Sequence, residues 1–418
     1  MHIDTGDTAW LIISTGLVML MTPALSLFYG GMVRSKNILA TLMQSFVSLG
    51  VISILWVLYG YSLSFGPDVH HLIGSLDWVM LKGVDSLPSQ TYAPTIPHQL
   101  FMLFQMMFAV ITPALITGAF AERFKFKTYM VFLPVWFTLV YCPIAHWVWG
   151  QGGWIKNLGG LDFAGGLVIH IASGMSALVV VLMIGRRLGW QKEQISPHNL
   201  SLTILGASLL WFGWFGFNAG SALSANEVAI KAFMTTQLAA AAGALGWLAI
   251  EWKRGGFPTT LGVASGAIAG LVSITPAAGY VSPAYAIIIG FVGGFICYCS
   301  VRTKNKLNID DSLDVVGIHG IGGIWGAIAT GIFASTGLIS GNLHLLLVQF
   351  IGVASVILYS FISTFAIVKV LDLTMGIRVS ADEEVLGLDM SQHGERGYSV
   401  EHHELLESFA REHGLVES

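Results

Sequence analysis

Two histidines, His170 and His319, lie within long apolar stretches in which few other side chains can ionise. An ionisable side chain in hydrocarbon is costly, so such a residue marks a substrate or proton path that faces the interior of a helical bundle. Paired imidazoles on opposed helices could bind a metal, relay protons or bind a small polar solute. A single buried histidine is more often structural, but two at matched positions favour a functional site.

An aspartate precedes each histidine, Asp162 in the first stretch and Asp314 in the second. We expect these two aspartates to lie at the mouths of their helices, where Asp162 could also cap a helix N-terminus. The two stretches lie in the fifth and the tenth predicted spans, so the second enters the membrane from the opposite side. This arrangement predicts an inverted repeat, in which the substrate site lies near the middle of the membrane between the halves.

Other kinds of chemistry have little support in the sequence. The cysteines Cys142, Cys297 and Cys299 all lie in apolar segments, which favours packing over a disulfide framework or a metal site. We find no phosphate-binding Gly-Lys-Ser/Thr loop and no His-Glu-x-x-His helix. We therefore expect a protein that is not an enzyme, with no metal, cofactor, catalytic residue or nucleic-acid partner.

The composition places these residues in a membrane protein. Of the 418 residues, 54% are apolar and only 11% are charged, whereas a soluble domain has about 25% charged residues. Apolar runs of membrane-spanning length recur along the chain, which predicts an all-α polytopic membrane protein. The first apolar run has no basic segment before it, so we predict no cleaved signal peptide.

A membrane span needs about 20 apolar residues, and the sequence contains eleven candidate segments. They lie at residues 9–29, 38–65, 99–121, 128–148, 164–185, 199–219, 228–250, 260–275, 283–300, 313–333 and 343–370. With the N-terminus outside, the inner loops carry 13 basic residues and the outer connections carry three, as the positive-inside rule requires. The C-terminus is then cytoplasmic. We predict a transmembrane domain at residues 1–370 and a cytoplasmic tail at residues 371–418.

Aromatic residues are the second notable feature. Phe104 and Phe108 lie four residues apart on one face of a predicted helix, Trp149 lies at a span boundary, and rings crowd together before Ser221. Tryptophans at a membrane boundary commonly form only an interfacial belt. Aromatic faces also bind small cations, however. Rings, a serine hydroxyl and buried histidines together suit a small cation that forms hydrogen bonds.

The chain also carries motifs, and these resemble those of the ammonium transporters of the Amt/Mep/Rh superfamily, on its Amt side. The resemblance covers nearly the whole chain. Its most specific motifs are Phe28-Tyr-Gly-Gly-Met-Val-Arg-Ser-Lys-Asn37, Gly118-Ala-Phe-Ala-Glu-Arg123, Leu161-Asp-Phe-Ala-Gly-Gly166, Gly213-Trp-Phe-Gly-Phe-Asn-Ala-Gly-Ser221 and Asp314-Val-Val-Gly-Ile-His-Gly320. The chain departs from the family pattern at Ala172 and Ser173, where Asn-Ala is frequent, and at Val316, where Phe is frequent.

The resemblance implies an eleven-span protein of the cell (inner) membrane that forms a homotrimer with one pore in each subunit. It also implies the roles of particular residues. Phe108, Trp149 and Ser221 match an outer ammonium-binding site supported by Asp162, Phe108 and Phe217 match a gate of stacked rings, and His170 and His319 match the twin histidines of the pore. The implied substrate is ammonium or ammonia, with methylammonium as a related candidate.

The resemblance further implies that ammonium is selected outside and loses its proton near the gate, so that ammonia crosses the pore. An alternative function is a membrane ammonium sensor with the same fold, as the transporter-like part of a larger signalling protein. The segments Gly387–Asp389 and His393–Tyr398 are similar to the family's tail, which meets PII-type signal proteins. The tail could instead only pack on the inner face of the trimer and couple the subunits.

Overall fold

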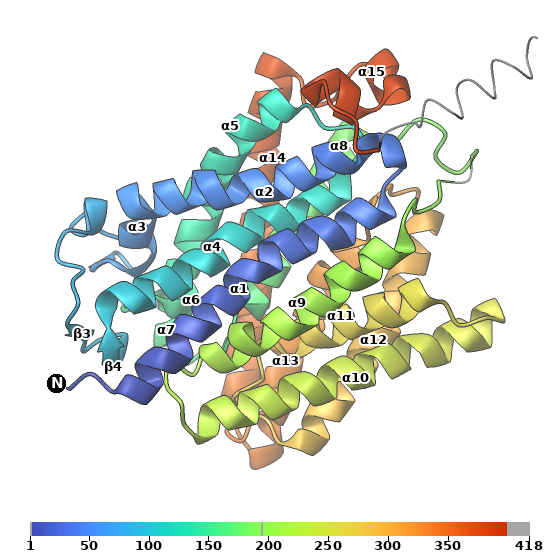
Figure 1. Ribbon diagram of the computed structural model, residues 1–418. Helices are drawn as coiled ribbons and strands as arrows, with labels where there is room; N and C mark the ends of the chain where they lie inside the picture. The colour runs from blue at the N-terminus through green and yellow to red at the C-terminus, as the bar shows by residue number, and fades with distance from the viewer. Residues whose placement is uncertain (1, 194, 399–418) are drawn as a thin grey trace, which may run out of the picture.

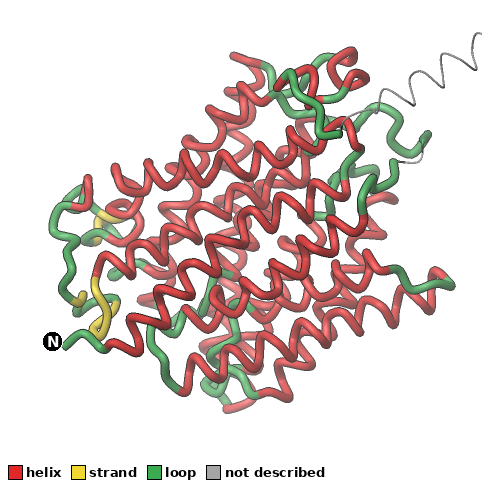
Figure 2. The backbone as a smooth tube through the Cα atoms, viewed as in Figure 1, coloured by secondary structure: helices red, strands yellow, loops and turns green. Residues whose placement is uncertain are grey.

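The computed structural model describes residues 2–193 and 195–398 and is dominated by helices. The long helices run side by side as a single bundle, and loops and short strands lie at its ends (Figures 1 and 2). A helix satisfies its own backbone hydrogen bonds, which is why helices can cross a lipid bilayer. The part of the predicted tail that follows residue 398 lies outside the described residues.

The helices and strands follow one another along the chain as follows. The α-helices are α1 (Thr5–Met32), α2 (Ile38–Leu55), α3 (Tyr61–Phe65), α4 (His98–Phe120), α5 (Phe126–Trp136), α6 (Cys142–Trp149), α7 (Trp154–Asn157), α8 (Ala172–Ile184), α9 (Leu200–Gly220), α10 (Glu227–Gly255), α11 (Thr260–Ile274), α12 (Pro283–Lys306), α13 (Gly322–Phe333), α14 (Leu343–Met375) and α15 (Ala381–Leu386). The π-helical segments are η2 (Trp56–Gly60), η4 (Phe137–Tyr141), η5 (Gly166–Ile171), η6 (Val316–Ile321) and η8 (Asp389–His393). The 3-10 segments are η1 (Ser35–Asn37), η3 (Val79–Leu81) and η7 (Leu338–Ser340), and the strands are β1 (Asp68–Val69), β2 (Ile73–Gly74), β3 (Pro88–Ser89) and β4 (Ala93–Pro97).

The number of spans agrees with the sequence. Ten helical runs of the described residues are long and apolar enough to cross a membrane, and α11 is an eleventh, shorter apolar helix of 15 residues. At 1.5 Å per residue α11 is only about 22 Å long. It packs among α9, α10, α12 and α13, so protein rather than lipid surrounds it. The predicted all-α polytopic fold is confirmed, whereas the orientation of the termini stays a prediction.

The two ends of the bundle differ. The segment between α3 and α4 forms two antiparallel pairs, β1 with β2 and β3 with β4, and the N-terminus is tied to it where the Asp4 N–H donates to the Thr95 carbonyl at 2.8 Å. We call this the strand end. The opposite end, which carries α15, we call the tail end (Figure 1). The strand segment lies within the loop that the sequence places at residues 66–98.

The two histidine-bearing segments cross the bundle in opposite directions. Helix α8 finishes at Ile184, whose carbonyl accepts a hydrogen bond from Arg378 at the tail end. Segment η6 begins at the tail end, just after Ser312, whose N–H donates to the carbonyl of Ala119 at the end of α4. This opposite sense is what an inverted repeat requires. In the same bundle α1 packs along the length of α9 (Figure 1).

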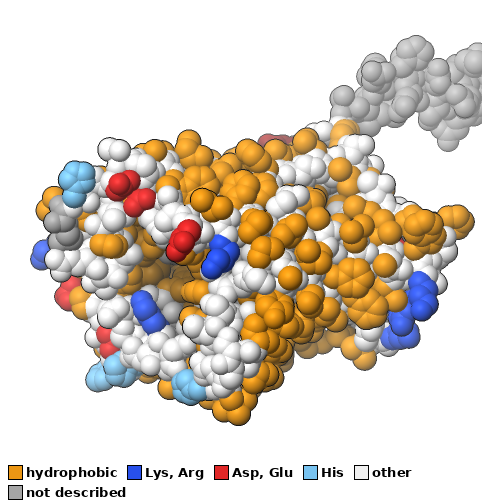
Figure 3. All heavy atoms as spheres, turned by 90° about the horizontal axis from the view of Figure 1, so that it is seen from below, with side chains coloured by type: hydrophobic (Ala, Val, Ile, Leu, Met, Phe, Trp, Pro, Cys, Tyr) orange, Lys and Arg blue, Asp and Glu red, His pale blue; other side chains and the backbone are white. Residues whose placement is uncertain are grey.

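Hydrophobic side chains cover the middle of the molecular surface. In Figure 3 they form a broad area, and charged and histidine side chains gather towards the two ends. Large side chains such as Leu347, Leu358 and Ile362 on α14 are at least half exposed. Such an exposed apolar area is unusual for a soluble monomer and is what a bilayer covers. The protein is a multi-pass membrane protein.

Buried charges hold the tail end together. The Glu122 carboxylate lies between the guanidinium groups of Arg34, at 2.9 Å, and Arg187, at 3.3 Å. Arg187 also pairs with Asp310 at 2.7 Å, and the Leu188 N–H donates to the Glu384 carboxylate of α15 at 2.6 Å. Burial alone raises the pKa of Glu122, but Arg187 and Arg34 outweigh it and lower the pKa below its ordinary value. The charge cluster therefore joins the loops before and after the long helices.

We predict that Glu122→Gln destabilises the protein by about 1–3 kcal/mol, because it leaves the partly buried guanidinium group of Arg34 without its carboxylate and Arg187 with Asp310 alone. The ionised carboxylate contributes stability above its ordinary pKa of 4.5, and this contribution is lost as the pH falls through the lowered pKa of the folded state. Apparent melting temperatures of purified protein measured from pH 7 downwards test this. Glu227→Gln, at an exposed position of α10, is the control. Equal melting temperatures for both variants at pH 7 contradict the prediction.

Candidate functional site

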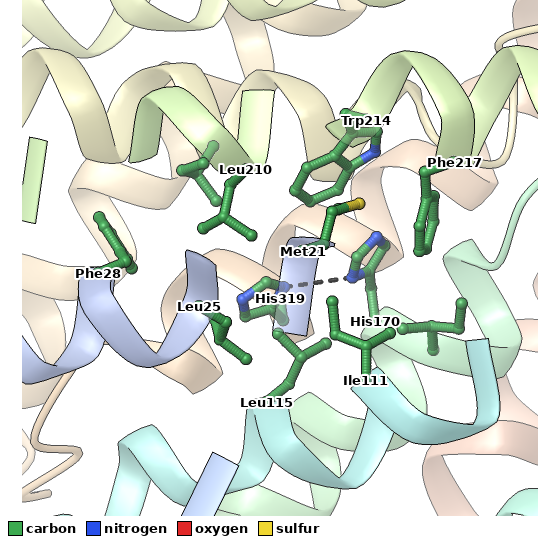
Figure 4. A pocket seen from close by; sticks show the side chains of 12 residues that line it. Met21, Leu25, Phe28, Ile111, Leu115, His170, Leu210, Trp214, Phe217 and His319 are labelled. Atoms are coloured by element: carbon green, nitrogen blue, oxygen red, sulfur yellow. Dashed lines mark hydrogen bonds between the residues drawn. The ribbon is translucent and has the colours of Figure 1, made fainter. Parts of the chain in front are cut away.

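The two histidines that the sequence singles out meet inside the bundle. His170 of η5 and His319 of η6 are 1% and 4% exposed, and their Nδ1 atoms are 3.2 Å apart, as the dashed line in Figure 4 shows. The ring planes differ by only 20°. In a neutral pair, one ring donates its Nδ1–H and the other accepts through Nδ1. The two Nε2 atoms then differ, one being an acceptor and the other an N–H donor.

Close backbone contact brings these segments together. Gly174, one turn after His170, lies against Gly320, and a Cβ atom at Gly174 would come within 2.4 Å of the Gly320 backbone. A side chain at Gly174 would therefore push the two segments apart and lengthen the contact between the imidazoles. Gly320 ends one of the sequence motifs, but only the three-dimensional packing shows what the two glycines do.

Apolar side chains surround the histidine pair and line a narrow cavity, the histidine cavity (Figure 4). Its lining residues are Met21, Leu25, Phe28, Ile111, Leu115, Ile169, His170, Leu210, Trp214, Phe217, Ile268 and His319. The Trp214 ring stacks near His170, with the ring centroids 5.7 Å apart. Among the described residues, Nε2 of His170 has no hydrogen-bond partner. The polar side-chain groups in this lining are the two imidazoles and the indole N–H of Trp214. The indole N–H donates to the Thr275 hydroxyl.

Two phenyl rings close the cavity towards the strand end. Phe108 of α4 and Phe217 of α9 are both 1% exposed, with ring centroids 4.4 Å apart. The ring centroids of Phe217 and His170 are 6.3 Å apart. The Phe104 ring packs against Phe108 with the ring centroids 4.9 Å apart. The structure therefore places the two predicted gate residues in contact, directly above the histidines.

A second cavity of about 230 Å³, the vestibule, lies on the other side of these rings. Its lining includes Phe108, Trp149, Asp162 and Ser221, so the four residues of the predicted binding site come together. Trp149 stands edge-on to Phe108 with centroids 5.9 Å apart, and its indole N–H donates to the Asp162 carbonyl at 2.9 Å. The Ser221 hydroxyl donates to the Phe217 carbonyl at 2.8 Å, which leaves its oxygen free to accept.

Asp162 organises the start of the first histidine segment. Its carboxylate accepts four backbone N–H groups, from Gly165 and Gly166 at 2.8 and 2.6 Å and from Leu167 and Val168 at 2.7 and 3.2 Å. Gly165 has φ +117°, a left-handed conformation that suits glycine and turns these amides towards the carboxylate. Burial raises the pKa of Asp162, although the four N–H donors oppose this shift. Asp162 therefore caps η5 and also lines the vestibule.

The aspartate that corresponds to it in the second half is Asp311, and the pairing of Asp314 with His319 is wrong. Asp311 accepts the N–H groups of Val315 and Val316 at 3.1 and 2.8 Å, whereas the Asp314 carboxylate forms an ion pair with Lys304. Asp162 and Asp311 each lie eight residues before their histidine, a spacing that could have identified Asp311 from the sequence. Burial raises the pKa of Asp311 to about 6, although Lys304 opposes the shift.

The fold and the site define a multi-pass membrane protein in which an aromatic vestibule, a ring gate and an apolar histidine cavity follow one another. Comparison with known proteins agrees. The profile described as the Ammonium Transporter Family matches residues 9–398. An ammonium transporter of Bacillus subtilis is 52% identical over 402 residues, which cover 94% of this chain and 98% of that protein. The chain belongs to the ammonium transporter family.

Solved structures show the same fold. The crystal structure of Candida albicans Mep2 superposes with a TM-score of 0.87 at 38% identity, over 95% of this chain and 91% of that one. A structure described as a sensor Amt protein superposes with a TM-score of 0.86 at 29% identity, over 93% of this chain and 98% of that one.

We predict that Asp311→Asn speeds amide hydrogen exchange at Val315 and Val316, because the new side-chain NH₂ group faces a backbone donor. The loss of a helix-capping acceptor costs about 0.5–2 kcal/mol, so exchange should rise about two- to thirtyfold. Hydrogen–deuterium exchange with mass spectrometry on detergent-purified protein measures the exchange rate of these two amides. Asp314→Asn is the matched control. An equal increase of the amide exchange rate in Asp311→Asn and Asp314→Asn means that Asp311 is not the capping residue.

Proposed function

We propose that the protein transports ammonium, and that its residues divide the work between capture, deprotonation and passage. The observation that carries this proposal is the hydrogen-bonded pair His170 and His319 in an otherwise apolar cavity, directly below the ring gate. Relatives that share about half of its residues are named ammonium transporters. Transport, rather than a chemical conversion, is the proposed activity.

Capture takes place in the vestibule. The ring faces of Phe108 and Trp149 attract a small cation, an interaction of up to about 2 kcal/mol or more where water is excluded. The Ser221 oxygen accepts a hydrogen bond from the cation. The buried carboxylate of Asp162 adds a negative charge that favours a cation over a neutral solute, while it holds the start of η5 in place.

Deprotonation allows the substrate to pass the gate. Moving an ammonium-sized ion into an apolar medium costs about 20 kcal/mol in the idealised limit and several kcal/mol in practice. Removing its proton at pH 7 costs about 4–5 kcal/mol, with the lysine amine pKa of about 10.4 as a high proxy. Neutral ammonia then moves along the imidazole pair, which offers one acceptor and one donor. The two imidazoles relay the released proton separately, so that one positive charge crosses the membrane with each ammonia molecule.

The assembly and orientation of the protein are part of the same proposal. The vestibule faces the outside and the tail end faces the cytoplasm, since basic residues such as Arg123, Arg187 and Arg254 concentrate in the connections at the tail end. Three copies assemble as a homotrimer with one pore each. Methylammonium is a second candidate substrate, and a PII-type signal protein is the candidate partner at the tail end, which α15 and η8 help to form.

The second candidate function is a membrane sensor of ammonium. It is favoured by one observation, the close superposition on the structure described as a sensor Amt protein. A sensor needs the vestibule to bind ammonium but needs no sustained passage through the histidine cavity. Transport and sensing therefore differ in a measurable current.

The deciding measurement is electrical. In purified protein reconstituted in liposomes on a solid-supported membrane, a pulse of ammonium should produce a current and a pulse of potassium should not. His170→Ala should reduce the ammonium-selective current by at least about tenfold, because it removes one half of the hydrogen-bonded pair. His344→Ala, which removes an exposed histidine at the strand end, is the control and should keep the current. Unaltered ammonium-selective currents in both His170→Ala and His319→Ala contradict the relay.

Saturable ammonium binding without a sustained current favours a sensor or a carrier of neutral ammonia. A proton flux measured with a pH-sensitive dye inside the liposomes separates these two outcomes, because ammonia that enters without its proton raises the internal pH.

A further inference from the structure

The vestibule wall carries a positive charge that the proposed mechanism does not use. Lys156 of α7 lines the same cavity as Phe108, Trp149, Asp162 and Ser221. A lysine ends in an alkylated ammonium group, with three N–H donors and a full positive charge. The proposed binding site for a cation therefore already contains a cation that is tethered to the protein.

The contacts of this lysine are of the kind that a free ammonium ion would seek. Its Nζ donates a hydrogen bond to the Trp149 carbonyl at 2.9 Å. It also lies over the Tyr92 ring, 5.6 Å from the ring centroid, within the range of a cation–π interaction. One carbonyl and one aromatic face at the vestibule are thus occupied by the side chain of Lys156.

Nearby carboxylates do not cancel its charge. Within the described part of the chain, Lys156 has no carboxylate within 4.0 Å and forms no ion pair. Asp162 is directed to four backbone N–H groups. Asp68 lines a neighbouring hollow across Tyr92, and its carboxylate is paired with His146 at 2.9 Å.

The short helix α7 is held in place, so the lysine cannot easily turn away as part of a mobile loop. The Trp154 N–H donates to the His71 carbonyl at 3.3 Å, which joins α7 to the strand segment. The Asn157 side chain donates to the Gly152 carbonyl at 2.9 Å. The next residue in sequence before Lys156 is Ile155, which is 1% exposed. Lys156 therefore projects from an anchored turn.

We propose that Lys156 is a resident cation of the vestibule, whose ε-ammonium group repels and competes with incoming ammonium and so sets the affinity of the site. This inference rests on the proposed capture of ammonium at Phe108, Trp149 and Ser221. It assigns a role in affinity rather than in passage, because Lys156 is not part of the lining of the histidine cavity.

The test is the ammonium dependence of the current in wild type, Lys156→Gln and Lys156→Met at low ionic strength. Removal of the charge should lower the half-saturating ammonium concentration by about three- to tenfold, the size expected for two unit charges that share a partly solvated cavity. High salt should shrink the difference between wild type and the variants, because exposed charges are screened. Lys82→Gln, which removes an exposed lysine elsewhere in the strand segment, is the matched control and should cause no such shift.

The inference is overturned if wild type and both Lys156 variants have equal half-saturating ammonium concentrations. It is also overturned if Lys82→Gln lowers this concentration as much as the Lys156 variants do. Lys156→Arg keeps the charge and should stay within about twofold of wild type if charge is the cause. Calorimetric titration of the same purified proteins with ammonium chloride gives the comparison without transport. Wild type that binds ammonium but carries no current contradicts the proposed transport and still leaves the effect of Lys156 on binding measurable.

Discussion

A full charge is far less stable in the apolar interior of this bundle than in water, and the arrangement of the site follows from that cost. The histidine cavity offers an ion no counter-charge among its lining residues and no polar side chains besides two imidazoles and an indole. His170 and His319 can stay neutral there because each satisfies the other through Nδ1. Charged groups such as Glu122 and Asp162 are kept to the two ends, where water, an ion pair or backbone N–H donors compensate them.

The same constraint explains how the ends of the histidine segments are built. The first amides of a helix have no partners within the helix, and in a membrane protein they cannot rely on water. Asp162 and Asp311 supply the missing acceptors at opposite ends of the bundle. Each carboxylate thus fixes the start of a histidine segment, and Asp162 also lines the vestibule.

The vestibule shows how positive and negative charges share one small space. Both Asp162 and Lys156 line it, and in the proposed mechanism Asp162 favours a cation there whereas Lys156 opposes one. At the tail end, by contrast, Glu122 and Asp310 are matched by Arg34 and Arg187 at salt-bridge distance, so that cluster serves stability and holds α15 near the loops. The two ends therefore use ionisable residues for different purposes.

The sequence alone determined the membrane class, the eleven spans and the identity of the buried histidines. These are local properties, since apolar length and an ionisable residue in an apolar run can be read without knowing the chain's path. The aromatic and serine residues of the vestibule came from the resemblance to a family, and the structure brings Phe108, Trp149 and Ser221 together.

Only the tertiary structure decided that the imidazoles meet through Nδ1 and that Lys156 lies in the vestibule. It also decided between Asp314 and Asp311 as the cap of the second histidine segment, for which the matched eight-residue spacing is a hint in the sequence. Each depends on groups that distant parts of the chain bring within a few ångströms, as His170 and His319 show, and local pattern does not encode such distances. Asp314 is nearer to His319 in sequence than Asp311, but the backbone turns at Asp314, with φ +64°, and directs Asp311 to the helix start.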